Sequence, residues 1–374
     1  MTTTATPATQ NITRASTEWR NRPDDERYLS LSDLRAAVSK RRTESWTTEG
    51  NPSAVTILPG PGDTIGAQVR NRTTGETVLL EPTNFAFGQL AQYAQAPGAY
   101  LRQLPAELAA INLQYGLDHR PVRDNVLTLA QSNGSHKLRA MTSTSYGRIW
   151  DLQVVDAVDR VNVSGNWQVP AASYAANNPK RATTLYASDR DVFIFLVDPN
   201  HPIEVNGEKL FRGFYTWNSE VGSATFGLAT FLYRYVCDNR IIWGATNVQE
   251  LRIRHTGGAP ERFAYEGARY LSRYANESTA ILTDQITRAQ AYEVAPAERA
   301  ADTATEGWGG WLKKRGFTDA LAKNAVAAAQ AEEGQARSLW DIVQGVSAYA
   351  RQIHHTDERV KVESMAGKLM NTVA

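Results

Sequence analysis

The sequence predicts an α+β protein with a largely antiparallel β-sheet core and with N-terminal and C-terminal helices. The central part of the chain, 161–256, is rich in β-branched and aromatic residues, which favour strands. Turn-forming pairs such as Asn206-Gly207 separate several of these runs, as in hairpins. By contrast, 259–297 and 318–372 are rich in Ala, Glu, Gln and Arg at helical spacing. The length of 374 residues suits a large core with appended helices.

The N-terminal part is expected to contain an arm, a helix and several short strands. Residues 1–25 hold almost no large apolar side chains, so they are expected to form a flexible arm. In the stretch LSLSDLRAAVSKRR, Ser30 or Ser32 can cap a helix. The following stretch, 53–84, has the pattern of short strands divided by turns that contain proline and glycine.

Helical and strand signals then alternate along the chain. Apolar residues three and four positions apart predict one helix that ends before Pro97-Gly98 and a second over about 106–116. Ser132-Asn133-Gly134 lies between two apolar stretches and predicts a hairpin, and a short helix is expected near 150–158. We therefore divide the chain into a flexible arm (1–25), an α+β core domain (26–298), a linker or finger (299–317) and a C-terminal helical segment (318–374).

The composition excludes several classes of protein. Cys237 is the one cysteine of the chain, so an internal disulfide and a multi-thiolate metal site are both excluded. The N-terminus lacks the apolar core of a signal peptide. The most apolar run, 224–237, is interrupted by Arg234 and is too short to span a bilayer. We expect a cytoplasmic protein without membrane contact.

No catalytic site, metal site or cofactor is predicted. Glu220 follows Ser219, but no His or Asp at a suitable local spacing completes an acid–base site. A nuclease or hydrolase is an alternative whose signature would be converging carboxylates for two metal ions. We interpret Asn218 to Glu220 as a structural turn in which a buried Glu220 pairs with an arginine such as Arg234.

Several spaced motifs resemble one known family. KLRAMTSTSYGRIWD, 137–151, is similar to the Leu-Arg-Ala, Ser, Tyr, then Asp pattern of the phage- and plasmid-encoded family catalogued as domain of unknown function 932. NSEVGSATFGLATFLYRYVCDNRIIWG, 218–244, resembles its Asn-Ser-Glu-x-Gly and later Arg-x-Val-Cys-x-Asn blocks. Tyr235 fills the variable position there, and Arg240 stands where Gly is expected. Further similarities lie at 85–100, 252–257 and 338–355, so the resemblance extends over roughly 32–355.

The resemblance implies an α+β fold and an origin in a mobile element, but no established reaction. The family occurs at phage and plasmid replication or recombination loci, which implies DNA handling, by analogy with phage single-strand annealing proteins. A phage-encoded member would work in the cytoplasm of the host cell.

A protein that binds single-stranded nucleic acid needs cations for the phosphates and flat side chains for the bases. In the strand 210–217, alternation puts Arg212 and Phe214 on one face and Tyr215 and Trp217 on the other. Either this strand exposes an Arg-aromatic platform, or both of its faces are covered. The predicted nucleic-acid-binding residues are Lys137, Arg139, Arg148, Arg212, Phe214, Arg252, Arg254, Lys313, Lys314 and Arg315.

Two hypotheses of function follow. The first is a non-enzymatic DNA-handling protein that holds single-stranded DNA in an Arg-aromatic groove, for annealing or protection, and that forms a homo-oligomer. The alternative is a mobile-element protein-interaction factor that binds a host or phage protein through its helical C-terminal third. Neither hypothesis requires a cofactor.

Overall fold

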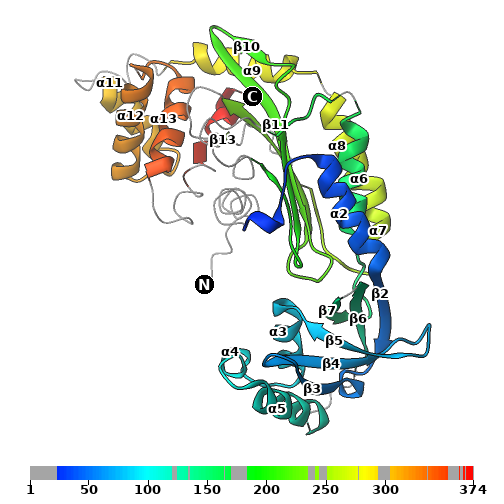
Figure 1. Ribbon diagram of the computed structural model, residues 1–374. Coiled ribbons are helices and arrows are strands. Elements are labelled where there is room, and N and C mark those ends of the chain that lie inside the picture. Colours follow the sequence, from blue (N-terminus) through cyan, green and yellow to red (C-terminus); the bar gives the residue numbers. More distant parts are fainter. Residues whose placement is uncertain are drawn as a thin grey trace.

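The fold contains two β-sheets flanked by helices, which is the α+β class that the sequence predicts. The structure, a computed structural model, describes residues 23–119, 124–133, 135–163, 165–169, 183–234, 241–243, 251–276, 278–293, 304–334, 336–352, 362, 365–366 and 368–373. The expected arm therefore lies outside the described residues, except for its last three. Figure 1 shows the larger sheet in the upper half of the molecule and the smaller sheet in the lower half.

The larger sheet, which we call the large sheet, has eight strands in the described part of the chain, and every pair is antiparallel. The strands are β1 (Arg27–Tyr28), β8 (Leu185–Ala187), β9 (Val192–Val197), β10 (Ile203–Val205), β11 (Glu208–Asn218), β12 (Phe226–Arg234), β13 (Ile241–Trp243) and β14 (Leu251–Ile253). Their order is β1-β8-β9-β11-β12-β13, with β10 beside β11 and β14 beside β12.

The strand β11 lies at the centre of the large sheet, between β9 and β12. It follows a two-residue turn in which Asn206 and Gly207 have φ values of 48° and 87°, the left-handed geometry that favours an Asn-Gly hairpin. This turn is the one that the sequence predicts. Near the other end of β11, Trp217 lies opposite Gly227, where any Cβ would collide with the indole ring.

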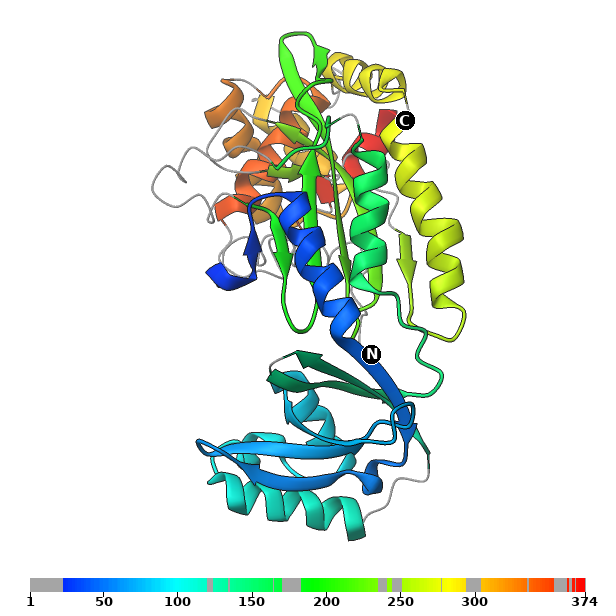
Figure 2. The ribbon, with the colours of Figure 1, turned by 45° about the vertical axis from the view of Figure 1, so that its right-hand side comes forward.

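Helices cover one face of the large sheet (Figure 2). They are α2 (Leu31–Glu44), α6 (Asp151–Val161), α7 (Ala259–Arg262), a π-helical segment (Phe263–Gly267) and α8 (Ala268–Asn276). Ser30 caps α2 by accepting a hydrogen bond from the backbone N–H of Asp33 at 3.0 Å, as expected. Phe214 of β11 is buried in the core between the helices and this face.

The opposite face of the large sheet is lined by aromatic side chains. Tyr215 and Trp217 of β11 belong to this cluster and are buried. Its other buried members are Tyr186, Phe193, Phe195, Val197, Phe211 and Ala229. Both faces of β11 are therefore buried, so this strand is core and does not form the exposed Arg-aromatic platform.

The smaller sheet, which we call the small sheet, has six strands in the described part of the chain. They are β2 (Ser45–Gly50), β3 (Thr56–Gly60), β4 (Thr64–Arg70), β5 (Thr77–Pro82), β6 (Val126–Asn133) and β7 (Ser135–Ser143), in the order β2-β6-β7-β5-β4-β3. The pair β5–β7 is parallel and the others are antiparallel. The hairpin β6–β7 turns where the sequence predicts it, between 132 and 136.

Helices α3 (Asn84–Tyr93), α4 (Gly98–Leu101) and α5 (Ala106–His119) pack on the small sheet through a shared apolar core. Two short 3-10 turns, η1 (Asp24–Glu26) and η2 (Pro52–Ala54), precede β1 and β3. The chain passes from α2 directly into β2 and later from β7 into α6, so two connections join the small sheet to the large one (Figure 1).

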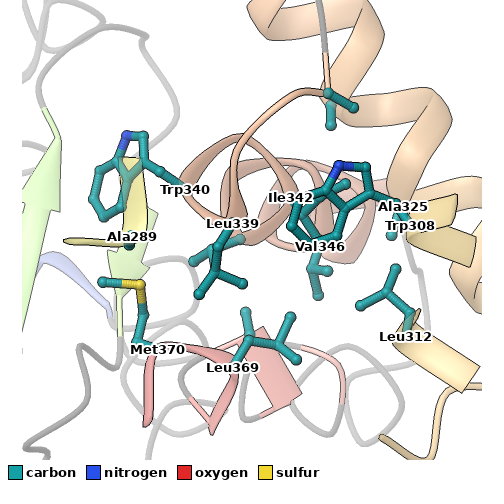
Figure 3. Close-up of a cluster of buried hydrophobic side chains, with 14 of the residues drawn as sticks. Ala289, Trp308, Leu312, Ala325, Leu339, Trp340, Ile342, Val346, Leu369 and Met370 are labelled. Atoms are coloured by element: carbon teal, nitrogen blue, oxygen red, sulfur yellow. The ribbon is translucent and has the colours of Figure 1, made fainter. Parts of the chain in front are cut away.

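The C-terminal helices form a separate core on the large sheet. They are α9 (Ala280–Ala291), α11 (Ala304–Lys313), α12 (Asp319–Glu333) and α13 (Leu339–Gln352), followed by the 3-10 turn η6 (Asn371–Val373). Figure 3 shows Trp308, Leu312, Leu339 and Leu369 gathered in this core. Leu210 of β11 belongs to the same cluster, so the helices are anchored on the sheet.

Of the segment 299–317, which was expected to be a linker or finger, the structure describes 304–317. The helix α11 covers most of this range, and both Trp308 and Trp311 are buried against its neighbours. Their indole rings lie 5.2 Å apart in an edge-to-face arrangement. Within the described ranges, no helix is both long and apolar enough to cross a bilayer.

Candidate functional site

A buried group of charged and polar side chains lies where the two sheets meet. We call it the charged cluster: Arg41, Arg139, Arg148, Asp151, Asn218 and Glu220. These residues come from α2, β7, the segment after β7, the start of α6, the end of β11 and the turn that follows β11. The cluster therefore joins elements of both sheets.

The Glu220 carboxylate is the centre of the charged cluster. Its Oε2 lies 2.7 Å from Nη2 of Arg139 and 3.7 Å from Nε of Arg41. Its Oε1 accepts a hydrogen bond from the backbone N–H of Asp151 at 2.9 Å. Because Asp151 begins α6, Glu220 also places a negative charge at a helix N-terminus, where the helix dipole stabilises it.

Asp151 is the second acid of the charged cluster. Its Oδ2 lies 2.5 Å from Nη2 of Arg41, and its Oδ1 accepts a hydrogen bond from Nδ2 of Asn218 at 2.7 Å. The same Nδ2 donates to the carbonyl of Ile149 at 2.8 Å. Buried charges require such partners, because desolvation without them is costly.

Arg148 and Tyr146 extend the cluster to the Ser219 turn. Arg148 donates from Nη1 to the backbone carbonyl of Glu220, and Tyr146 donates from its hydroxyl to the carbonyl of Ser219 at 2.8 Å. The Tyr146 ring stacks on His255 with centroids 4.9 Å apart. Three of the motifs noted in the sequence, those that contain Arg139, Glu220 and His255, thus meet at one place.

Burial and neighbouring charges shift the two acids in opposite directions. Burial, reinforced by the charge of Glu220, raises the pKa of Asp151 from 3.8 to about 8, although Arg41 opposes the shift. Burial also acts to raise the pKa of Glu220, but Arg139 and Arg41 together outweigh it and hold this pKa below its ordinary value. Glu220 is therefore the permanent anion of the cluster.

The three arginines keep the cluster positive. Burial lowers the pKa of Arg148 from 12.5 to about 10, which leaves it protonated at neutral pH. Burial acts to lower the pKa of Arg41 as well, but Glu220 and Asp151 raise it overall. Three guanidinium groups thus face two carboxylates, and the cluster carries a net positive charge in either protonation state of Asp151.

The carboxylates of the cluster orient arginines. The side chains of Asp151 and Glu220 are each 1% exposed, and each contacts a guanidinium group. A general base must reach the proton that it removes, and these buried oxygens are already occupied by arginines and backbone. No group of three or more His, Cys, Asp or Glu side chains in the described part of the chain is placed to hold a metal ion.

A cleft of about 450 Å³ lies beside the charged cluster, between the two sheets. Arg41 and Arg139 form part of its wall, and Lys137 of β7 adds a third cation. The other lining residues are Glu81, Pro82, Thr83, Asn84, Gln131 and Asp189. Two of them are acids, so the three cations leave the lining with one net positive charge, and its polar side chains suit a hydrated, negatively charged ligand. We call it the basic cleft.

The hollow surface continues from the basic cleft along the small sheet. A second cleft of about 300 Å³ shares Glu81, Pro82 and Asn84 with the first and includes Arg102. Arg102 donates to Oδ1 of Asn84 at 2.7 Å and lies with its guanidinium carbon 4.6 Å from the Phe87 ring centroid. A fourth cation therefore borders the same continuous surface.

Four of the ten predicted nucleic-acid-binding residues are buried, which corrects the prediction of an Arg-aromatic groove on β11. They are Arg139, Arg148, Arg212 and Phe214. Arg212 donates to the carbonyl of Tyr274 at 3.3 Å, and the Phe214 ring packs edge-on against Trp167 at 5.0 Å. These four side chains thus contact other parts of the protein and little solvent. Arg139 also borders the basic cleft.

The other predicted cations are dispersed over the surface. Arg252 lies 5.8 Å from the ring centroid of the buried Trp217, and Arg254 is exposed after β14. Lys313 pairs with Asp319 at 2.6 Å. Lys314 and Arg315 are exposed after α11, and Arg315 stacks 3.5 Å from the Trp311 ring centroid. The structure brings Lys137 and Arg139 together, and it places Arg252 and Arg254 on a different sheet from them.

The structure shows which residues contact the turn Asn218–Glu220, a question that the sequence left open. Glu220 holds Arg139 and Arg41, while Asn218 holds Asp151. Arg234, the partner suggested from the sequence, lies in β12 opposite Leu210, and its side chain is outside the described residues.

Two members of the charged cluster were missed in the sequence. Asp151 ends the motif KLRAMTSTSYGRIWD, so its place in that motif was a usable signal. Arg41 occurs in a run of basic residues at the end of a helix, which is more often a solvated surface than a buried ion pair. No feature of the neighbouring sequence distinguishes Arg41 from an exposed basic residue.

Comparisons with known proteins give one match. A family described as Domain of unknown function (DUF932) matches residues 142–368. The match begins near the end of β7, so it contains the large sheet except β1, together with the C-terminal helices, and leaves out nearly all of the small sheet. No curated protein and no solved structure matches the chain. Because the matched region covers more than half of the sequence, the chain belongs to the family of domain of unknown function 932.

Proposed function

We propose that this protein binds nucleic acid through the phosphate backbone, without catalysing a reaction on it, and that the basic cleft is the binding site. The observation that supports the proposal is the lining of one polar cleft by Lys137 together with Arg41 and Arg139, whose largely buried guanidinium groups lie in its wall. Arginine and lysine in a groove neutralise phosphates and release counterions, and this term supplies most non-specific nucleic-acid affinity.

The charged cluster makes the cleft wall rigid. Arg41 and Arg139 are fixed by Asp151 and Glu220, so they do not lose side-chain freedom when a ligand binds. The third guanidinium group of the cluster, Arg148, leaves it with an excess of positive charge next to the cleft. This arrangement favours a bound anion over a cation or a neutral ligand.

The same geometry favours binding over catalysis. The acids of the cleft lining are Glu81, which pairs with Lys137 at 2.6 Å, and Asp189, while Asp151 and Glu220 are buried behind it and contact arginines. Glu81, Asp151 and Glu220 are thus each engaged with a basic residue. Annealing or protection of a strand requires positioning and charge neutralisation alone.

Fluorescence anisotropy with a labelled single-stranded oligonucleotide at low salt tests the proposal. Lys137→Glu reverses a half-exposed charge in the cleft, so we expect affinity to fall by at least about threefold. The matched control is Lys209→Glu, which reverses an exposed, ion-paired lysine on the β10–β11 hairpin away from the cleft. Absence of binding by the wild type, or equal loss in the two variants, would overturn the proposal.

An exposed apolar stripe on α5 supports self-association as a further part of the proposal. Leu108, Ile111 and Tyr115 are each at least half exposed and are spaced three and four residues apart, so they share one helix face. Exposed apolar patches of this kind mark interaction surfaces. Sedimentation velocity over a range of concentrations should show a dimer or larger species that Ile111→Glu disrupts. A monomer at every concentration would contradict self-association through α5.

A further inference from the structure

We propose that the exposed face of α8 and the π-helical segment before it is a stacking surface for unpaired bases, which makes single-stranded nucleic acid the substrate class. The inference rests on the proposed function, because it adds a base-binding surface to the phosphate-binding cleft. The residues that form this surface, which we call the Tyr–Arg face, are Tyr265, Glu266, Arg269, Tyr270, Ser272 and Arg273.

The π-helical segment turns one tyrosine outward. Phe263 is buried against Phe226, with ring centroids 4.9 Å apart, whereas Tyr265 is 67% exposed. Gly267 completes the wide turn, and a Cβ there would lie 2.8 Å from the Phe263 ring. Single π-turns within α-helices are rare and often lie at functional sites. The segment thus anchors on the core through one aromatic ring and presents another to solvent.

Arginines accompany both tyrosines on this face. The guanidinium carbon of Arg269 lies 5.0 Å from the Tyr265 ring centroid, and that of Arg273 lies 5.6 Å from the Tyr270 ring centroid. The four side chains surround a shallow surface hollow of about 540 Å³. Cation–π attraction favours this arrangement of rings and guanidinium groups before a ligand arrives, and such preorganisation lowers the entropy cost of binding.

The charge of the face is complementary to a phosphate backbone. Between 268 and 276 the chain has two arginines and no acid. Glu266, the acid in the hollow, is held by Arg262, with Oε2 3.2 Å from Nη2 of that arginine. Alternation of flat rings and cations along a surface is the pattern that binds single strands, because every base has a π-face and every nucleotide has a phosphate.

A double helix does not present its bases in this way, since they are stacked on one another inside the duplex. The Tyr–Arg face therefore predicts a preference for single strands, which the basic cleft alone does not. An acidic peptide would satisfy the arginines but would not need the exposed Tyr265 ring.

Fluorescence anisotropy with labelled single-stranded and double-stranded oligonucleotides tests the inference. Tyr265→Ala should weaken single-strand binding by about 5- to 100-fold, the usual cost of one lost base–aromatic stack. Tyr265→Phe retains the ring and should bind within twofold of the wild type. Tyr100→Ala removes another exposed tyrosine, in α4, and serves as the matched control that should leave binding unchanged.

The outcomes separate the two proposals. If the wild type binds neither oligonucleotide, the proposed function is wrong, and this inference falls with it. If the wild type binds and Tyr265→Ala binds equally well, the Tyr–Arg face is not the stacking surface, and the basic cleft stands alone. If Tyr265→Ala weakened the binding of single and double strands equally, the inference would also be overturned. The same holds if a poly-glutamate peptide bound as tightly as the single strand and Tyr265→Ala weakened its binding by the same factor.

Discussion

Glu220 links three parts of the structure through a single carboxylate. It pairs with Arg139 of the small sheet, approaches Arg41 of the covering helix α2 and accepts the first backbone N–H of α6. Removal of one partner from such a group leaves an uncompensated charge in the interior, which costs far more than the intact pair contributes.

Glu220→Gln should therefore strongly destabilise the protein. We expect a loss on the order of 3–5 kcal/mol in the free energy of unfolding, because Arg139 and Arg41 lose their counterion while remaining buried. Urea unfolding followed by circular dichroism measures the loss. The control is Glu81→Gln, which breaks the partly exposed pair with Lys137 and should cost less than about 1 kcal/mol. Similar losses in the two variants would show that Glu220 is not a buried counterion.

The raised pKa of Asp151 gives stability a specific pH dependence. Burial and the charge of Glu220 raise the pKa of Asp151 in the folded protein from 3.8 to about 8. The proton on Asp151 contributes fully to the free energy of unfolding below the pKa that this group has in the unfolded chain. This contribution is lost as the pH rises through about 8, and the free energy of unfolding falls by up to about 1.4 kcal/mol per pH unit.

Asp151→Asn removes this titration, so the stability advantage of the wild type over the variant should shrink between about pH 5 and pH 8. Urea unfolding of both proteins at each pH measures this difference in the free energy of unfolding. A difference in stability that is constant over this range would contradict the assigned pKa.

At the residue scale, the sequence identified Glu220 as a buried partner of arginine but not the arginines that it holds. Arg139 was assigned to nucleic acid, since a basic residue in a strand carries no local mark of burial. Arg41 and Asp151 are 110 positions apart, and only the tertiary fold brings them within 2.5 Å.

Among the elements, α12 and α13 show how glycine sets helix spacing. A Cβ on Gly345 of α13 would collide with the Ala325 carbonyl and the Ala329 side chain of α12, so the two helices approach closely at this point. Gly309 of α11, by contrast, has no neighbouring atom within 4 Å of a Cβ.

Alanine substitutions at these two glycines should have opposite effects. Gly345→Ala should destabilise the protein by about 1–3 kcal/mol through overpacking, whereas Gly309→Ala should stabilise it by about 0.5–1 kcal/mol through helix propensity. The midpoint of thermal unfolding reports both changes. A loss of stability in Gly309→Ala, or none in Gly345→Ala, would argue against this packing of the C-terminal helices.

Strong local signals made many of the elements predictable. The capping of α2 by Ser30, the Asn206-Gly207 turn and the β6–β7 hairpin follow from side-chain chemistry and alternation that act within a few residues. The helix α11 was not predicted, because the glycines of WGGW suggest a loop. In the structure, burial of Trp308 and Trp311 overrides the weak helix propensity of those glycines.

At the scale of the whole molecule, the sequence indicated one α+β core domain, whereas the structure has two sheets joined through α2–β2 and β7–α6 (Figure 1). The basic cleft exists because of this division, since Arg41 and Asp189 come from the large-sheet side and Lys137 and Arg139 from β7. Pairing between strands that are distant in the sequence decides such an arrangement, and periodicity does not reveal it.

The salt dependence of single-strand binding tests the central claim most directly. For the wild type we expect log affinity to fall linearly with log salt concentration, with a slope of about −0.7 for each phosphate neutralised. Lys137→Glu should reduce the magnitude of that slope by about 0.7 or more, and Lys209→Glu should leave it unchanged. Binding that is independent of salt, or a slope that Lys137→Glu does not alter, would contradict phosphate binding in the basic cleft.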